Sequence, residues 1–270
     1  MGGNLPLHLV LSVGGVLMLF PFYWMIVTSF KGLDEASGLP PTLWPASWQW
    51  DNYIRAWQAA PFGRYFVNTL IVAGGQTLAV LVTSTLAAYT FARVGFRGKN
   101  VVFIIFLGTL MIPLEVLLVP DFIILKYLGW YDTYLALIVP FSASVFAIFL
   151  LRQFFLSIPN ELWDAAQIDG CGRLGFLWRV AVPLAKPALV TVGLLTFHAG
   201  WNSLLWPLIV TGSTDMRVLQ VGLTAFQSDA RVQYHLWMAA ATFTIAPMLV
   251  IFLFAQRYFI EGVARAGIRG

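Results

Sequence analysis

Charged side chains are scarce in this sequence. Asp, Glu, Lys and Arg make up only 10% of its 270 residues, whereas a soluble domain carries about 25%. Hydrophobic residues make up 59% of the chain, and the mean hydropathy is +0.79. This composition excludes an ordinary soluble domain and predicts an integral membrane protein whose helices contact membrane lipid.

Cysteine, metal-ligand motifs and nucleotide-binding motifs are also lacking. Cys171 is the single cysteine, which excludes an internal disulfide, and the three histidines lie far apart without Cys/His metal spacing. The phosphate-binding pattern G-x-x-x-x-G-K-[ST] is absent. We therefore expect no metal and no cofactor in this chain, and the chain cannot hydrolyse ATP alone.

Long apolar runs account for most of the chain. A spanning helix needs about 20 consecutive apolar residues. The runs that meet this length are Leu7–Phe30, Phe66–Ala92, Val101–Ile124, Thr133–Leu151, Pro187–Thr214 and Leu236–Ala255. The first has neither a basic n-region nor a small-residue cleavage site, so we expect a retained helix rather than a signal peptide. The prediction is an all-α integral membrane protein with six transmembrane helices in a single domain, residues 1–270.

Basic residues in the predicted loops indicate the orientation, because cytoplasmic loops carry an excess of Lys and Arg. One side would hold both termini, the turn after the second run and the segment 152–186. It carries Arg93, Arg97, Lys99, Arg152, Arg173, Arg179, Lys186, Arg257, Arg265 and Arg269. The other side carries Lys31, Arg55, Arg64, Lys126, Arg217 and Arg231. Ten against six predicts cytoplasmic termini and a cytoplasmic 152–186 segment. It also explains the net charge of +4 without a nucleic-acid partner.

The segment 152–186 is polar and helix-like, and it lies between two apolar runs that carry no charge. Pro159 suits the first turn of a helix, where no amide donor is needed. Glu161 and Asp164 would lie near the positive end of the helix dipole. Gly170 can take the left-handed conformation that ends a helix. A short helix between Pro159 and Gly170 is therefore predicted.

Small residues give this predicted helix little bulk. Leu162, Ala165, Ala166 and Asp169 fall at i, i+3, i+4 and i+7, so the two alanines share a face. Gly170 follows directly. We expect such a helix end to insert into a cleft on another protein.

An acidic residue in the third run invites a functional interpretation. Glu115 lies between Pro113 and Pro120, which free backbone carbonyls where protein or water can satisfy them. An ionisable group in a span is unfavourable unless it faces the bundle interior or a cavity. Glu115 therefore either lines a cavity or path within the membrane or is a structural hydrogen-bonding group.

Polar and aromatic residues in the fifth run offer a second candidate. His198, Asn202 and Trp206 recur every four residues, which would place them on one helix face. Trp201 and Trp206 could stack on a ring of a ligand while Asn202 bonds one of its hydroxyls. The alternative is a polar contact that holds two helices together.

The string from Asp164 to Pro187 resembles the "EAA" loop of the membrane subunits of ABC importers. It has Asp164-Ala165-Ala166, then Gly170 after three residues, then Pro183-Leu184 and Pro187. Strings that are similar to the maltose-type carbohydrate branch, and to its smaller six-helix permease, are Ile158-Pro159, Ile168-Asp169-Gly170, Met111-Ile112-Pro113, Leu128-Gly129-Trp130, Arg152-Gln153-Phe154-Phe155, Gly200-Trp201-Asn202, Trp206-Pro207-Leu208 and Gln256-Arg257-Tyr258-Phe259. The triplet begins with Asp164 instead of Glu, which keeps the charge.

The resemblance implies the type I ABC importer permease fold, with 152–186 as a cytoplasmic coupling loop and alternating access as the mechanism. It implies a sister permease subunit, an ATPase dimer that binds ATP and Mg, and an extracytoplasmic solute-binding protein. The location implied is the cytoplasmic (inner) membrane of a bacterium or archaeon. The ATPase-coupling residues would be Glu161, Asp164, Ala165, Ala166, Asp169 and Gly170. The tail after Arg257 would either touch the ATPase or act as a basic anchor.

The expected function is thus to form half of a translocation path for a sugar or polyol. The expected path residues are Glu115, His198, Trp201, Asn202 and Trp206. One alternative is the same fold importing glycerol phosphate, a peptide or an amino acid. The six runs contain no Lys or Arg to pair with an anion, which favours a neutral solute. The other alternative, an intramembrane enzyme, would need a cluster of reactive side chains, and Glu115 with His198 is a thin set.

Overall fold

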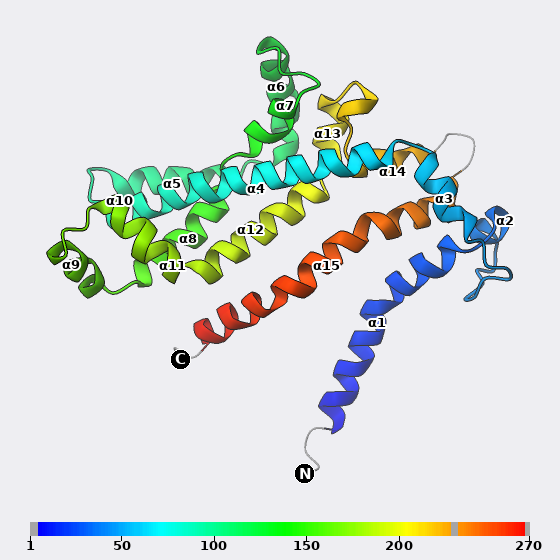
Figure 1. Cartoon of the computed structure of the whole chain (residues 1–270), viewed down its shortest axis with the longest axis horizontal. Coiled ribbons are helices and arrows are strands. Elements are labelled where there is room, and N and C mark those ends of the chain that lie inside the picture. The colour runs from blue at the N-terminus through cyan, green and yellow to red at the C-terminus, as the bar shows by residue number, and fades with distance from the viewer. Residues whose placement is uncertain (1–4, 228–231, 268–270) are drawn as a thin grey trace. The chain divides into compact units, whose positions relative to one another are not determined.

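The computed structural model describes residues 5–227 and 232–267, with the side chains of 7–227, 232–254 and 256. These residues are mainly helical (Figure 1), and the one extended pairing among them is an isolated bridge between Gln227 and Val232. The helices, with 3-10 and π turns labelled η, are α1 Leu5–Ser29, α2 Leu33–Ser37, α3 Asp51–Gln58, α4 Phe62–Arg93, α5 Lys99–Thr109, α6 Leu114–Tyr127, α7 Tyr134–Ile138, η1 Val139–Phe141, α8 Val145–Ser157, α9 Asn160–Ile168, α10 Arg173–Phe176, η2 Leu177–Ala181, α11 Val182–Leu184, α12 Lys186–Trp201, α13 Leu205–Val210, η3 Thr214–Met216, α14 Leu219–Leu223, η4 Thr224–Phe226 and α15 Tyr234–Gly267. The side chains of Arg231 and of the basic tail from Arg257 onward lie outside this description.

Three helices of the described chain are each long and apolar enough to cross a membrane: Leu7–Ser29, Phe62–Arg93 and Tyr234–Phe254. They correspond to the first, second and sixth predicted helices. Three further candidates are pairs of helices that bend by more than 40° at a short break, so the count reaches six if each pair is one span. The six-helix prediction fits this arrangement, but three of its helices are broken.

The predicted third helix breaks at Pro113. Helices α5 and α6 meet at an angle of 96°, and Pro113 is the N-cap residue of α6. Proline has no backbone N–H and disfavours the helical conformation of the residue before it. The chain therefore starts a new helix at this point instead of continuing α5. Glu115 is thereby placed in the first turn of α6.

The prediction of a continuous helix over Pro187–Thr214 is wrong in its second half. Helix α12 ends at Trp201, and Asn202 is its C-cap residue. The separate helix α13 carries Pro207 in its first turn, a position where a proline is tolerated. The candidate span in this part of the chain joins α10–α11 to α12 at an angle of 79°.

At the break in the predicted fourth helix, side chains from other helices donate hydrogen bonds to backbone carbonyls. Pro140 has no N–H, so the carbonyl of Ala136, four residues earlier, receives no bond from it. The indole Nε1 of Trp206 donates to this carbonyl at 2.9 Å. The amide Nε2 of Gln76 donates to the next carbonyl, that of Leu137, at 2.7 Å. Helices α13 and α4 therefore hold the end of α7 in place.

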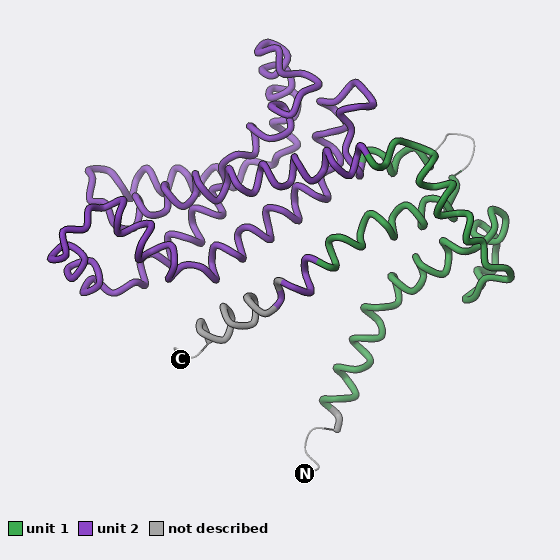
Figure 2. Tube along the Cα trace, in the orientation of Figure 1, with its two compact units in different colours: residues 1–63, 221–250 green, residues 64–220, 251–270 purple. Residues whose placement is uncertain are grey.

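The chain divides into two compact units (Figure 2): residues 1–63 and 221–250 form unit 1, and residues 64–220 and 251–270 form unit 2. In unit 2, helix α8 packs against both α5 and α12. The core of this packing includes Tyr89 of α4, Leu151 and Phe155 of α8, and Phe176 of α10, each less than 5% exposed. All candidate site residues lie in unit 2.

Unit 1 is organised around Phe30, which directly follows α1. The ring of Phe30 lies 5.0 Å from that of Trp48, 4.7 Å from that of Trp50 and 5.3 Å from that of Tyr53. The neighbouring Lys31 is only 1% exposed, and its ammonium lies 4.5 Å from the Trp24 ring centroid. Burial lowers the pKa of Lys31, and nearby Glu35 partly opposes this. This cluster fixes the loop that leaves α1.

Candidate functional site

The predicted short helix in 152–186 is present as α9. Pro159 is its N-cap residue, one position before the predicted first turn, and Gly170 ends it with a φ of +73°. The amide of Cys171 donates to the carbonyl of Ala166 at 2.8 Å, and the amide of Gly170 donates to that of Gln167 at 3.0 Å. These two bonds form a Schellman motif. The sequence-based prediction of the end of this helix at Gly170 is confirmed.

The two alanines of α9 face in different directions. Glu161, Asp164, Ala165 and Ile168 share one exposed face, whereas Ala166 is 9% exposed and belongs to the core of unit 2. The expectation that both alanines enter a partner's cleft is therefore wrong for Ala166, which is small because the protein's own core covers it. Ile168 is 87% exposed, and the sequence analysis assigned it no role of its own. The sequence did offer a signal: Ile168 follows Glu161 by seven residues, and this helical spacing places both residues on one face.

Helix α4 ends beside α9 (Figure 1) and holds the segments on both sides of it. The guanidinium of Arg93 donates to the carbonyl of Phe155 at 2.9 Å, to the carbonyl of Ile158 and to Oδ1 of Asn160 at 2.6 Å. The first two carbonyls belong to the end of α8, where a helix leaves acceptors unpaired. On the far side of α9, the hydroxyl of Tyr89 donates to the carbonyl of Arg173 at 3.1 Å. Side chains of α4 thus bond the chain just before and just after α9.

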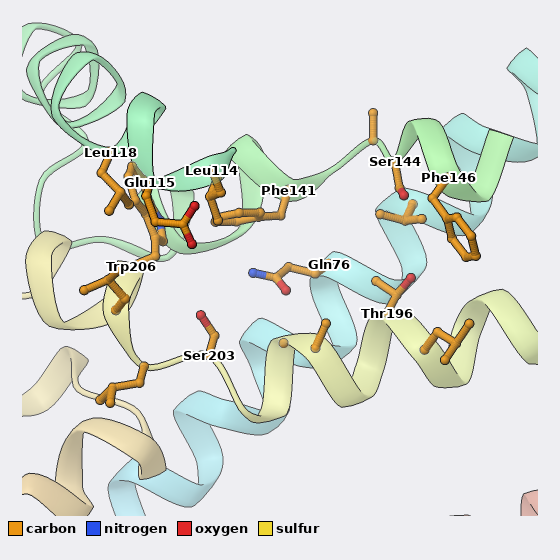
Figure 3. A pocket seen from close by; sticks show the side chains of 17 residues that line it. Gln76, Leu114, Glu115, Leu118, Phe141, Ser144, Phe146, Thr196, Ser203 and Trp206 are labelled. Atoms are coloured by element: carbon orange, nitrogen blue, oxygen red, sulfur yellow. The ribbon is translucent and has the colours of Figure 1, made fainter. Parts of the chain in front are cut away.

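A cavity of about 550 Å³ lies within unit 2, between α4, α6, α12 and the segment that leads to α13. Its lining includes Gln76, Val80, Leu114, Glu115, Leu118, Phe141, Ala143, Ser144, Phe146, Leu195, Thr196, Ala199, Gly200, Ser203, Leu204, Leu205 and Trp206. The carboxylate of Glu115, the amide of Gln76 and the hydroxyl of Ser203 point into the same space (Figure 3). The cavity is mostly apolar with a few convergent polar groups, as ligand sites are.

The structure brings only two of the five predicted path residues to this cavity, Glu115 and Trp206. The expected shared face of His198, Asn202 and Trp206 does not exist, because α12 ends at Trp201. His198 and Asn202 are exposed, and the Asn202 amide donates to the carbonyl of His198 at 2.9 Å. Trp201 is 1% exposed, and its ring packs against Phe66 and Phe197, at 5.7 Å from each.

Several lining residues were missed as functional candidates. Gln76, Ser144, Thr196 and Ser203 line the cavity, and none of them is among the path residues expected from the sequence. Gly200 is what brings α12 close to α4: a Cβ added there would lie 2.6 Å from Oε1 of Gln76 and 3.1 Å from Cα of Ala73. The signal available in the sequence was an amide side chain, Gln76, within an apolar run; its position opposite Gly200 follows only from the tertiary structure.

Asp132 stabilises a turn of unit 2 outside the membrane-spanning helices. Its Oδ1 accepts the amides of Gly212 at 2.9 Å and Ser213 at 3.1 Å, and its own backbone has a φ of +61°. Partial burial would raise the pKa of this carboxyl, but hydrogen bonds from Ser213 and Gly212 outweigh it and lower the pKa below its ordinary 3.8. The ionised carboxylate therefore links the α6–α7 loop to the segment after α13.

Residues 79–265 match the model of the family described as "Binding-protein-dependent transport system inner membrane component". The chain belongs to this family. The matched residues include α9 and most of the cavity lining. The permease is thus a transport subunit and not an enzyme, and in ABC importers nucleotide binding belongs to a separate ATPase subunit.

Relatives cover the permease almost end to end. It is 35% identical to the probable ABC transporter permease protein YurM of Bacillus subtilis over 93% of this chain and 84% of the relative. It is 34% identical to the arabinooligosaccharides transport system permease protein AraQ of the same species, over 99% and 96%. It is also 34% identical to the sn-glycerol-3-phosphate transport system permease protein UgpE of Yersinia enterocolitica, over 95% and 94%.

Solved structures show the same fold. A chain of a bacterial ABC transporter involved in the import of the acidic polysaccharide alginate superposes on the permease with a TM-score of 0.84, over 95% of this chain and 96% of the other, at 24% sequence identity. A second structure, of the alginate transporter with a pentasaccharide-bound periplasmic protein, gives a TM-score of 0.67 over 92% of each chain at 18% identity. The all-α importer permease fold predicted from the sequence is confirmed.

Proposed function

We propose that this permease forms half of the translocation path for a sugar or polyol in an ATP-driven importer. The observation that supports a sugar or polyol is the cavity lining, where hydroxyl, amide and carboxylate groups converge between aromatic and aliphatic walls. Sugars present hydroxyls that pair with such groups and apolar ring faces that pack on such walls. Within this proposal Glu115 and Trp206 act from the cavity. His198 and Asn202 act from exposed positions next to it, and Trp201 holds α12 against α4.

The proposed docking element for the ATPase is the exposed face of α9. Glu161, Asp164 and Ala165 would contact the ATPase directly, and Asp169 would flank them. Gly170 would serve by ending the helix, and Ala166 by seating it on the core of unit 2. ATP and Mg would be bound by the ATPase dimer, and a sister permease and an extracytoplasmic solute-binding protein would complete the importer. Both termini and 152–186 would face the cytoplasm, and residues 1–270 would act as one permease domain.

The proposed mechanism is alternating access. ATP closes the ATPase dimer, which displaces α9. Because Arg93 and Tyr89 bond the chain on either side of α9, α4 moves with it. The cavity would then open toward the solute-binding protein, receive the solute, and return to the inward state after hydrolysis.

One other solute class is supported by a specific finding. The glycerol-3-phosphate permease UgpE is 34% identical to this chain over 95% of its length, which is comparable to the oligosaccharide permease AraQ. A phosphate-bearing solute would need cationic groups, and the cavity lining has none. Sugar or polyol import is therefore the better-supported proposal.

Reconstitution tests the proposal. The permease, its sister, the ATPase and the cognate binding protein would be placed in liposomes containing ATP, and uptake of labelled arabinooligosaccharides, other neutral sugars and glycerol 3-phosphate would be measured. ATP-dependent uptake of a neutral sugar or polyol is expected. Uptake of glycerol 3-phosphate alone would establish the alternative, and ATP-dependent uptake of only peptides or amino acids would refute both.

A further inference from the structure

The cavity lining carries negative charge only. Glu115 is the one ionisable residue among the lining residues, all of which the structure describes, and neither Lys nor Arg is present there. The other polar side chains are the neutral Gln76, Ser144, Thr196 and Ser203. A cavity with this lining offers hydrogen bonds to hydroxyl groups and a like charge to anions.

The positive end of α6 is not left open to an anionic solute. The N-terminus of a helix favours an anion, and the N-terminus of α6 opens at the cavity through Leu114 and Glu115. Glu115 occupies this first turn, so its own carboxylate already interacts with the positive end of the dipole. An anionic solute would meet the carboxylate there.

We propose that this cavity is a solute-binding site of the permease that accepts neutral, hydroxyl-rich solutes, and that Glu115 excludes anionic ones. The proposal rests on the proposed function and specifies the solute class at the same site. Gln76 and Ser203 hold solute hydroxyls opposite Glu115, while Phe141 and Trp206 form the aromatic wall. The bond from Trp206 to Ala136 keeps this wall fixed.

The size of the selection follows from Coulomb's law. Two like charges about 5 Å apart at an effective dielectric of about 20 repel strongly enough to lower affinity roughly 100-fold. Replacing Glu115 by Gln keeps a hydrogen-bonding side chain and removes the charge. Glu115→Gln should therefore improve binding of an anionic solute by up to about that factor, and change binding of the neutral counterpart only several-fold.

A thiol-protection assay on the full complex tests the site directly, without the solute-binding protein and its own selectivity. The native Cys171 is replaced by Ser, and Thr196→Cys provides a reporter inside the cavity at a residue with no assigned solute contact. The rate of modification by N-ethylmaleimide, an uncharged reagent, is measured against increasing concentrations of glucose, maltose, glucuronate and glucose 6-phosphate. Ala199→Cys is a second reporter in case the first variant does not assemble.

Protection by a neutral sugar at concentrations roughly 100-fold below those needed for its anionic counterpart is expected, and Glu115→Gln should abolish this difference. Asp121→Asn is the matched control, because Asp121 lies on the same helix but does not line the cavity. Equal protection by both classes, or stronger protection by the anions, would overturn the charge selection. No protection by any probe, in a complex that still imports a sugar with ATP, would overturn the site and leave the proposed function standing.

Discussion

Replacing Arg93 by Ala should uncouple the permease from ATP hydrolysis without removing it from the membrane. Arg93 closes α4, and its three hydrogen bonds reach the end of α8 and the start of α9. The substitution leaves the carbonyls of Phe155 and Ile158 without this donor and releases the side chain of Asn160. The apolar part of α4 is untouched, so insertion should survive.

The magnitude follows from these contacts. A hydrogen bond to a charged group contributes about 1.5–3 kcal/mol, and the half-buried position of Arg93 calls for the lower end because solvent screens it. Three such bonds, which are not independent, amount to about 3 kcal/mol, which is roughly a 100-fold weaker preference of the α8–α9 junction for its bonded arrangement. We expect solute transported per ATP hydrolysed to fall on the order of 10-fold or more, while basal ATP hydrolysis persists.

The assay measures ATP hydrolysis and uptake in the same proteoliposomes. Arg93→Lys should recover part of the ratio, because Lys keeps the charge but cannot form the planar fork. Arg97→Ala is the matched control, since Arg97 is exposed and lies four residues after Arg93, beyond the end of α4. An unchanged ratio in Arg93→Ala would refute the reasoning that α4 carries the motion of α9.

Three further predictions concern single contacts. Ile168→Asp should weaken ATPase co-purification by an order of magnitude or more, since burying an Ile contributes about 1.5–3 kcal/mol. Gln167→Asp, at a neighbouring exposed position, should have a smaller effect. Equal effects would contradict a role for Ile168 in docking. Gly200→Ala should destabilise the permease by about 1–3 kcal/mol through overpacking, measured as a lower Tm in detergent. Gly193→Ala should have little effect, because the nearest atom to the new Cβ is 3.5 Å away. Asp132 has a lowered pKa, so the stability that its carboxylate adds to the fold is present above pH 3.8 and is lost as the pH falls below that value. Asp132→Asn should remove this part of the pH dependence of Tm. An unchanged pH profile of Tm in this variant would contradict the role of the carboxylate.

The sequence predicted those elements of the fold that depend on local chemistry. Apolar length identified the helices that run unbroken, such as Phe62–Arg93, and the glycine at 170 identified the end of α9. The breaks were missed because an apolar run looks the same whether one helix or two occupy it. Pro113 and Pro140 were the signals, but a proline inside a run can also be tolerated, as Pro120 is in α6. Only the tertiary contacts decide between these outcomes.

The same limit explains which site residues were found. Glu115 was identified because a charge in a span needs a cavity or a partner, and this argument does not require an unbroken helix. The grouping of His198 with Trp206 required one, and it failed where α12 ends. Ala166 was assigned to the wrong face because helical spacing shows which residues lie together, but not which side of a short helix the rest of the protein covers.

The hydrogen bonds from Arg93 can transmit motion because α4 is continuous. Within the residues of unit 2 that the structure describes, the other candidate spans are bent pairs, with angles of 96°, 43° and 79°. Helix α4 runs without such a break from Phe62 to Arg93 and carries Gln76 into the cavity on the way. Gln76 and Arg93 are seventeen positions apart, which corresponds to about 25 Å of helix. A displacement of the loop at Arg93 therefore reaches the cavity through one rigid element, whereas the bent pairs can change their angles and absorb it. For this reason, removing the hydrogen bonds of Arg93 should impair transport more than substitutions within the bent pairs that leave the cavity lining intact.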